Sequence, residues 1–222
     1  MDLETCKQRA AEKAVTFVKD GMVVGLGTGS TAAYFIQALG AAAPSIHVVA
    51  SSKASLILAE QCGLKLQDPT HLTSIDLYVD GADEIDPEKQ MIKGAGGALL
   101  REKILSHMSL KTLIIVDESK LVPKLGIRPL PVEIVPFCAD ATIHHLKALG
   151  YSGTFRTNDD RSLYFTDNHN HLYDIQLPTA AIPIAQHHAR ISVIPGVVDT
   201  GFFEGRRGEV VIGFKDGSVV VQ

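Results

Sequence analysis

The 222-residue sequence has few cysteines, no tryptophan and no long apolar run, and these absences exclude several classes of protein. Its three cysteines, Cys6, Cys62 and Cys138, are odd in number, far apart and outside any Cys-x-x-Cys pair. This pattern argues against a disulfide framework or a cysteine zinc site and predicts a reduced, cytoplasmic protein. No apolar stretch approaches the roughly 20 residues of a membrane helix, so we expect no membrane partner. The charged N-terminus, MDLETCKQRAAEK, also lacks the apolar core of a secretory signal.

An excess of positive charge is missing as well. The net charge is −4, so the chain has no basic field to hold nucleic acid or an anionic membrane. Two histidine pairs, at 144–145 and 187–188, are the remaining candidates for metal ligands. Adjacent residues on a helix point about 100° apart, so neither pair is expected to face one ion. We therefore predict no metal site.

Four short apolar segments alternate with helical ones before residue 120. Each apolar segment ends in small or polar residues, and the four segments are 22–26, 46–50, 75–79 and 113–116. Nearly continuous apolar strands alternating with helices are typical of a parallel sheet covered on both faces. In such open sheets ligands bind at the carboxyl ends of the strands. The predicted fold class is α/β, with a Rossmann-like parallel sheet core and helices on both faces.

The pattern changes after Pro129-Leu130-Pro131. The order strand, helix, strand, strand, helix, strand follows, and it predicts a smaller ferredoxin-like α+β domain. Its predicted elements are strands at 132–135, 162–166 and 171–176, helices at 139–149 and near 181–190, and a last strand at 194–198. The closing segment has an Asp216-Gly217 turn typical of a hairpin. We expect this hairpin to return to the first domain, which gives an α/β catalytic domain at 1–128 and 207–222 and a small domain at 129–206.

The segment 25–31, GLGTGST, is a glycine-rich loop between a predicted strand and a predicted helix. Glycines let the backbone approach a ligand, and the free N–H groups at a helix start favour an anion such as phosphate. Ser30 stands where the dinucleotide fingerprint has its last glycine, and the GxxxxGK[ST] pattern is absent. The loop therefore favours a small phosphorylated ligand over a nucleotide, although a tight turn without a ligand would use the same residues.

Carboxylates and a lysine follow the third predicted strand. The segment 80–84, DGADE, places three carboxylates within five residues, and 93–97, KGAGG, is a second glycine loop. Such a cluster would also suit Mg²⁺, but the ammonium group of Lys93 would compete with the cation. The acids would alternatively cap a helix. Together, the acids and the lysine favour hydrogen bonding and proton transfer on a polyhydroxylated substrate.

Helical periodicity alone gives Glu102 no function. On a helix over 98–108, Leu100 and Ile104 lie four residues apart, so we expect both to face the core. Glu102 then lies about 200° from Leu100 around the helix axis. Periodicity thus predicts a solvated glutamate beside Arg101 and Lys103.

Several motifs together point further than any single loop. In this order along essentially the whole chain, the sequence resembles ribose-5-phosphate isomerase, type A. The matching segments are GLGTGSTA at 25–32, YVDGADEID at 78–86, KGAGGALLREKI at 93–104, DESK at 117–120, PLPVEIVP at 129–136, TDNHN at 166–170 and IPGVVDTGFF at 194–203. One departure is Ala95, because many members of that family have glycine there, and alanine disfavours a positive φ angle.

The resemblance implies an enzyme of the non-oxidative pentose phosphate pathway that interconverts D-ribose 5-phosphate and D-ribulose 5-phosphate without a metal or organic cofactor. It implies that Glu102 is the general base, which removes the proton at C2 of the open aldose, forms a cis-enediolate and returns the proton at C1. It further implies a homo-oligomer, a dimer or a tetramer. The substrate contacts that it implies are Thr28, Gly29, Ser30, Thr31, Asp80, Gly81, Ala82, Asp83, Lys93, Gly94, Ala95, Gly96 and Lys120.

The chemistry of such a reaction fits these residue types. Proton abstraction beside a carbonyl needs a base within hydrogen-bond reach, and the charge that develops on the carbonyl oxygen needs a preorganised donor. Lys93 is the expected cation for that oxygen. Asp80 and Asp83 are expected to move protons between the two oxygens and to open the ring, with their roles unassigned. Lys7 is a further candidate for the phosphate, and an exposed helix lysine is the equally simple interpretation.

A second class of function uses the same loops without chemistry. A sugar-phosphate-binding regulatory domain would keep the phosphate loop and would not need the base. Such a protein usually has a DNA-binding helix-turn-helix, and the residues before Met22 leave no room for one. The presence of Lys93 and Glu102 favours the isomerase.

Overall fold

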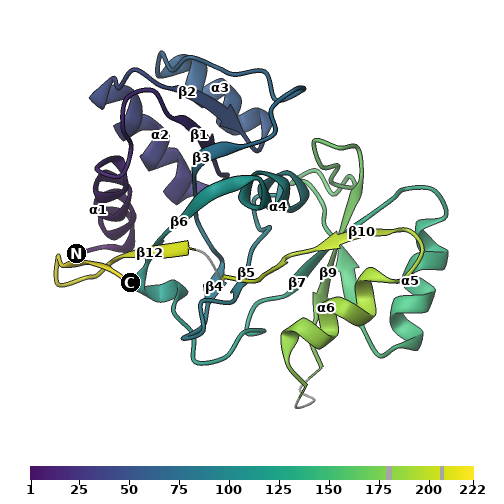
Figure 1. Cartoon of the computed structure of the whole chain (residues 1–222). Coiled ribbons are helices and arrows are strands. Elements are labelled where there is room, and N and C mark those ends of the chain that lie inside the picture. Colours follow the sequence, from purple (N-terminus) through teal and green to yellow (C-terminus); the bar gives the residue numbers. More distant parts are fainter. Residues whose placement is uncertain (179–181, 206–207) are drawn as a thin grey trace. The chain divides into compact units, whose positions relative to one another are not determined.

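The computed structural model describes residues 1–178, 182–205 and 208–222, and its internal contacts divide the chain into two compact units (Figure 1). The first unit contains Met1–Ala82, Arg101–Leu121 and Gly205–Gln222, and the second contains Asp83–Leu100 and Val122–Glu204. These limits differ from the predicted ones, because 83–100 and 122–128 belong to the second unit and Gly205 belongs to the first. Two short strands, at 84–85 and 91–92, tie 83–100 to the second unit, since the later one pairs with a strand near the end of that unit and the earlier one pairs with the later.

The first unit is built on a six-stranded sheet of order β13-β12-β6-β3-β1-β2. Its strands are β1 (Val23–Leu26), β2 (His47–Ala50), β3 (Ile75–Asp80), β6 (Ser109–Asp117), β12 (Gly208–Gly213) and β13 (Val219–Val221). Neighbouring strands are parallel except at the edge, where β13 runs antiparallel to β12. The predicted parallel sheet is therefore confirmed, and the closing hairpin joins it as expected.

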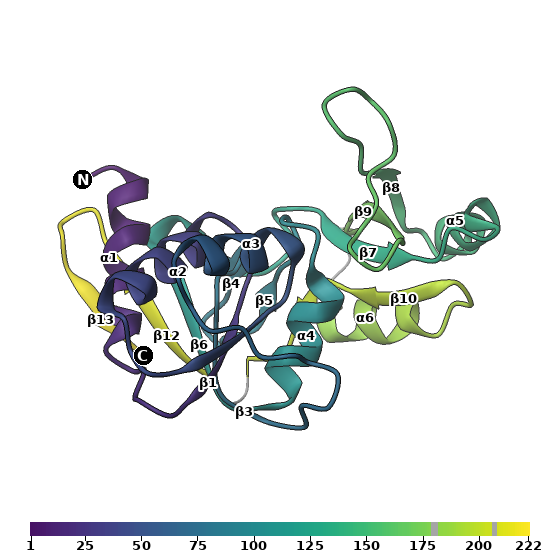
Figure 2. The same cartoon turned by 90° about the horizontal axis from the view of Figure 1, so that it is seen from above.

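Helices pack on both faces of this sheet. They are α1 (Leu3–Val15), α2 (Ser30–Ala42), α3 (Lys53–Gln61) and α4 (Leu99–His107), and a short 3-10 helix, η1 (Glu118–Lys120), follows β6. On β3, Leu77 and Val79 pack into a core that includes Phe35 of α2, while Tyr78 points to the other face and packs with Leu105 of α4. Figure 2 shows α1, α2 and α3 next to one another along the chain's first unit. Alternation along β3 thus separates two buried layers.

The second unit contains a four-stranded antiparallel sheet of order β10-β7-β9-β8. Its elements are β7 (Leu130–Ile134), α5 (Ala139–Ala148), β8 (Ser152–Phe155), β9 (His171–Gln176), α6 (Ile184–Ser192) and β10 (Val197–Thr200). This order and connectivity confirm the predicted ferredoxin-like arrangement. The helix predicted near 181–190 is α6, and residue 181 lies outside the described residues. A separate sheet of order β11-β5-β4 contains β4 (Glu84–Ile85), β5 (Met91–Ile92) and β11 (Phe202–Phe203).

The strand predicted at 162–166 is wrong. The partner of β9 is β8, whose residues Ser152-Gly153-Thr154 give almost no apolar signal. Residues 162–166 instead belong to a connection with isolated bridges from Leu163 and Phe165, and Asp160 turns the chain there by accepting from the Ser162 N–H at 2.9 Å. In the described part of the chain, no helix has the length and hydropathy needed to cross a bilayer.

Candidate functional site

The first glycine loop leaves β1 and opens α2, as predicted. Gly29 is the N-cap of α2 with φ 115°, a backbone conformation that glycine adopts without strain, and no side chain caps the helix start. At Gly27 the constraint is space, because a Cβ atom there would lie 2.0 Å from Cγ of Asp80. The loop thus presents the open N-terminus of a 13-residue helix, a preferred position for a phosphate group.

Asp80 is fully buried at the end of β3 and fixes this loop. Its Oδ1 accepts from the backbone N–H of Thr28 at 3.1 Å and of Gly81 at 2.7 Å. Its Oδ2 accepts from the hydroxyl of Tyr78, which is itself fully buried. Burial, followed by the negative charges of Asp80 and Glu102, holds the pKa of Tyr78 well above its ordinary value. Tyr78 therefore remains a hydroxyl donor to Asp80 throughout the physiological pH range.

The predicted contacts Thr28, Ser30 and Lys7 come together in the first unit. The Thr28 hydroxyl lies 2.8 Å from the Ser51 hydroxyl and 2.9 Å from that of Ser52, at the end of β2. The Lys7 ammonium of α1 donates to the Ser30 hydroxyl at 3.2 Å. Lys7 is thus not an ordinary exposed helix lysine, since its side chain is only 14% exposed and reaches the glycine loop.

Glu102 is buried, so the solvated position that periodicity predicts for it is wrong. It is 2% exposed, whereas Ile104, expected in the core, is 53% exposed. The buried stripe of this helix runs through Leu99, Glu102 and Leu105, which are spaced by three residues. Burying a carboxylate costs free energy that an apolar side chain at the same position would not cost. A glutamate in this stripe therefore points to a chemical role rather than a packing role.

At the end of β6, Asp117 is fully buried and its Oδ1 accepts from the Ser119 N–H at 2.9 Å, which starts η1. Lys120, a predicted substrate contact, is half-buried at the end of this short helix. The turn that Asp117 caps therefore fixes the backbone position of Lys120.

The second unit contains Lys93, Asp83 and the second glycine loop. Lys93 is 3% exposed, its N–H donates to the carbonyl of Gly201 at 2.8 Å, and its ammonium lies 5.3 Å from the centre of the Phe203 ring. Asp83 accepts at Oδ2 from the N–H of Ala95 at 2.9 Å. Positive φ angles occur at Gly94 and Gly97, and not at Ala95. The alanine is therefore compatible with the local backbone.

The third acid of the 80–84 segment has a structural contact instead. Glu84 is buried, its Oε2 accepts from the N–H of Gly126 at 2.7 Å, and its Oε1 accepts from the N–H of Arg128. Asp80, in the first unit, is bonded to Tyr78 and Thr28. Across residues 1–178, 182–205 and 208–222, no group of three or more histidine, cysteine or acidic side chains is arranged to hold a metal ion.

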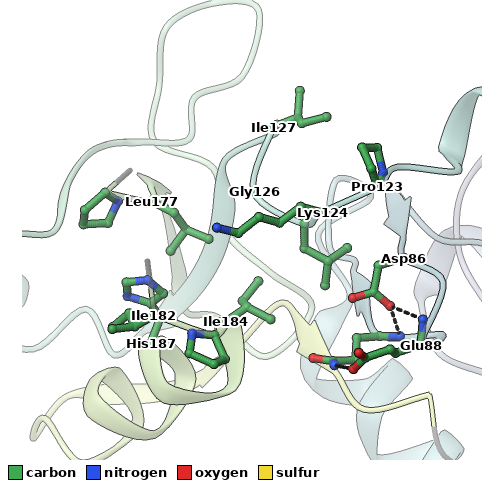
Figure 3. A pocket seen from close by; sticks show the side chains of 14 residues that line it. Asp86, Glu88, Pro123, Lys124, Gly126, Ile127, Leu177, Ile182, Ile184 and His187 are labelled. Carbon is green, nitrogen blue, oxygen red and sulfur yellow. Dashed lines mark hydrogen bonds between the residues drawn. The ribbon is translucent and has the colours of Figure 1, made fainter. Parts of the chain in front are cut away.

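A cavity of about 530 Å³ in the second unit has no predicted site residue among the residues that line it. Lys124 extends into it, and Leu177, Ile184 and His187 line it (Figure 3). His187 is buried, and its Nδ1 lies 2.9 Å from the Tyr151 hydroxyl. Burial, followed by the positive charges of Arg190 and Lys124, lowers the pKa of His187, so the ring is neutral at pH 7.

Sequence reasoning missed several residues that hold the predicted ones. Tyr78 reads as a core aromatic because it lies within an apolar strand, and Ser51 and Ser52 read as a strand end. Arg156, which contacts the second glycine loop, is 61 and 62 residues from its acceptors. No local pattern could reveal a contact over that separation.

Comparison with known proteins gives consistent results. Residues 47–217 match the family model described as ribose 5-phosphate isomerase A (phosphoriboisomerase A). A curated ribose-5-phosphate isomerase A from Protochlamydia amoebophila is 47% identical over 214 residues, covering 95% of this chain and 92% of that protein. One from Bacillus mycoides is 43% identical and covers 95% of this chain and 96% of its own length.

Solved structures agree over the whole chain. A D-ribose-5-phosphate isomerase in complex with phospho-erythronic acid has a TM-score of 0.92 and 34% identity, covering 100% of this chain and 99% of that chain. Ribose 5-phosphate isomerase A from Neisseria gonorrhoeae has a TM-score of 0.91 and 35% identity, covering 99% and 96%. The enzyme from Plasmodium falciparum has a TM-score of 0.93 and 31% identity, covering 99% and 98%.

Proposed function

Since the chain belongs to the ribose 5-phosphate isomerase A family and interconverts ribose 5-phosphate and ribulose 5-phosphate, we propose that Glu102 is the general base of this reaction. The observation that supports this role most is the burial of its carboxylate in the stripe of α4 that otherwise holds apolar side chains. The comparisons give no support to a non-catalytic regulatory domain.

The reaction proceeds through proton transfers on the open aldose. Glu102 removes the hydrogen at C2 as a proton, and the electron pair left behind forms the C1–C2 double bond of a cis-enediolate. The carbonyl oxygen at C1 gains the negative charge, which the ammonium of Lys93 stabilises. Glu102 then returns the proton to C1. Asp80 and Asp83 move the hydroxyl proton from the oxygen on C2 to the oxygen on C1 and assist ring opening.

The phosphate is held by the first glycine loop. Thr28, Gly29, Ser30 and Thr31 supply hydroxyl and N–H donors at the uncapped start of α2, where the helix dipole favours negative charge. Lys7 adds a cation next to Ser30. The remaining predicted contacts with the sugar or phosphate are Gly81, Ala82, Gly94, Ala95, Gly96 and Lys120. Phospho-erythronic acid, bound by a neighbour of the same family, offers a phosphate and a carboxylate to such donors.

The proposal is tested by following the conversion of D-ribose 5-phosphate in excess chelator. Removal of a general base lowers turnover by about 10²–10⁴-fold, so Glu102→Gln should lose that much while it still binds phospho-erythronic acid. Glu12→Gln, an exposed glutamate on α1, is the matched control and should match the wild type. Near-normal turnover by Glu102→Gln would contradict the role. Loss of wild-type activity on chelation would show that a metal is needed.

We also propose that the enzyme acts in the cytoplasm as a homo-oligomer, a dimer or a tetramer. The unpaired cysteines suit a reducing compartment, because Cys6 is buried and all three are free thiols. Light scattering coupled to size-exclusion chromatography tests the assembly, and a mass equal to one chain would contradict it.

A further inference from the structure

The glycine loop of the second unit needs support from outside itself. Three of its five residues are glycine, and glycines lose more conformational freedom on folding than other residues do. Lys93 starts this loop, and Asp83 is bonded to it through the N–H of Ala95. Whatever fixes the backbone at 94–95 therefore also fixes two side chains to which the proposed mechanism gives chemical roles.

The guanidinium of Arg156 holds the backbone of residues 94 and 95. We propose that Arg156 is a positioning residue for catalysis, which holds the loop of Lys93 and Asp83 in its productive conformation. Its Nη1 donates to the carbonyl of Gly94 at 2.8 Å and to that of Ala95 at 3.0 Å. This inference rests on the function proposed for Lys93 and Asp83.

Asp174 fixes the guanidinium in turn. Arg156 Nε donates to Asp174 Oδ2 at 2.9 Å, and its Nη2 donates to Asp174 Oδ1 at 2.6 Å. This bidentate pair is charge-assisted and planar, so it sets the direction in which Nη1 points. Arg156 directly follows β8, and Asp174 lies on β9, the antiparallel partner of β8. The Arg156 N–H donates to the carbonyl of Leu172 on β9 at 2.8 Å, so the clamp is anchored to the sheet at both residues.

Two N–H groups of the loop are held by acceptors on other segments. Lys93 donates its N–H to Gly201, and Ala95 donates its N–H to Asp83, so the groups from the Lys93 N–H to the Ala95 carbonyl are restrained in sequence. Among these contacts, only the two to the loop carbonyls come from a side chain that makes no contribution to the proposed chemistry. A displacement of about 1 Å at a catalytic group can lower the rate about 10²-fold. Arg156 therefore acts on turnover through Lys93 and Asp83.

An added small cation should restore part of the activity that is lost when Arg156 is replaced. A cavity of about 290 Å³ is lined by Arg156, Asp174, Asp83 and Ala95, and it provides room for a small cation beside the loop. In Arg156→Ala we expect kcat for ribose 5-phosphate to fall 10- to 100-fold with a smaller change in KM. Guanidinium ion at tens of millimolar should recover part of the lost kcat. Arg156→Lys keeps the charge without the fork, and its kcat should lie between those of wild type and Arg156→Ala.

Hydrogen exchange supplies a readout that does not depend on catalysis. Amides of residues 91–98 should exchange at least tenfold faster in Arg156→Ala, and those of β12 should not change. Lys111→Ala removes a salt bridge of the same 2.6 Å length to Glu209, within the first unit, and should leave kcat and the exchange rates at 91–98 unchanged.

Two results would overturn the proposal. The first is a kcat within twofold of wild type in Arg156→Ala or, if that variant does not fold, in Arg156→Lys. The second is a loss of kcat that guanidinium does not recover while exchange at 91–98 stays unchanged. A failure of the proposed function looks different, because Lys93→Met would then retain its turnover whatever Arg156 does.

Discussion

Tyr78→Phe removes one oxygen atom from the centre of the first unit, and its effect can be worked out from the structure. The hydroxyl donates to Oδ2 of Asp80, and both side chains are fully buried. A hydrogen bond to a charged group contributes about 1.5–3 kcal/mol, and a buried acceptor that loses its donor pays the full cost of desolvation. The free energy of unfolding should therefore fall by about 1.5–3 kcal/mol.

Tyr34 provides a matched control. Its hydroxyl also donates to a carboxylate, Oε2 of Glu4, at 3.0 Å, but this pair is exposed to solvent. Water replaces the lost partner there, so Tyr34→Phe should lower the free energy of unfolding much less than Tyr78→Phe does. Urea unfolding of the two variants beside the wild type, analysed with a common slope, measures the difference. Equal effects in the two variants would refute the view that burial makes the Asp80 contact strong.

Three further predictions concern other parts of the molecule. Because burial lowers the pKa of His187, the unfolded chain binds a proton that the folded chain does not, and the free energy of unfolding should fall as the pH drops below about 6.5. In urea unfolding at several pH values, His187→Gln should show a weaker dependence on pH than the wild type. An equal dependence in the two proteins would contradict this prediction. Glu84→Gln should lower the free energy of unfolding in urea by about 1.5–3 kcal/mol, since Glu84 accepts from two backbone N–H groups, and a loss under 0.5 kcal/mol would contradict this. Lys7→Met should raise KM for ribose 5-phosphate about tenfold with kcat within threefold, and steady-state kinetics showing a loss in kcat alone would rule out a binding role.

The parallel sheet could be predicted from the sequence because its strands are apolar on both faces. The closing hairpin was equally readable, since the Gly217 N–H bonds back to the carbonyl of Phe214 in a turn that Asp-Gly favours. Strand β8 was missed because Ser152, Gly153 and Thr154 have no apolar alternation, and its place depends on pairing with β9. Non-local pairing decides such a strand more than local propensity does.

The candidate site likewise has some features that the local sequence predicts and others that only the folded structure shows. Its loops were found from glycines and carboxylates at strand ends, a local signal. The burial of Glu102 was not, because a helical wheel assigns apolar residues to the core and cannot anticipate a carboxylate there. The hydrogen bond from Tyr78 to Asp80 could not be predicted. Strand alternation places the two side chains on one face, but it does not show that the hydroxyl reaches the carboxylate. Contacts such as that of Arg156 with Gly94 exist only in the folded chain.

The role of Glu102 is tested most directly by exchange of the C2 hydrogen of ribose 5-phosphate with solvent. In D₂O, the wild type should place deuterium at C1 of the ketose and, through the reverse reaction, at C2 of the aldose, both visible by NMR. Glu102→Gln should lose this exchange together with turnover while it still binds phospho-erythronic acid. Retained exchange at C2 in Glu102→Gln would show that another group removes the proton, and it would contradict the account.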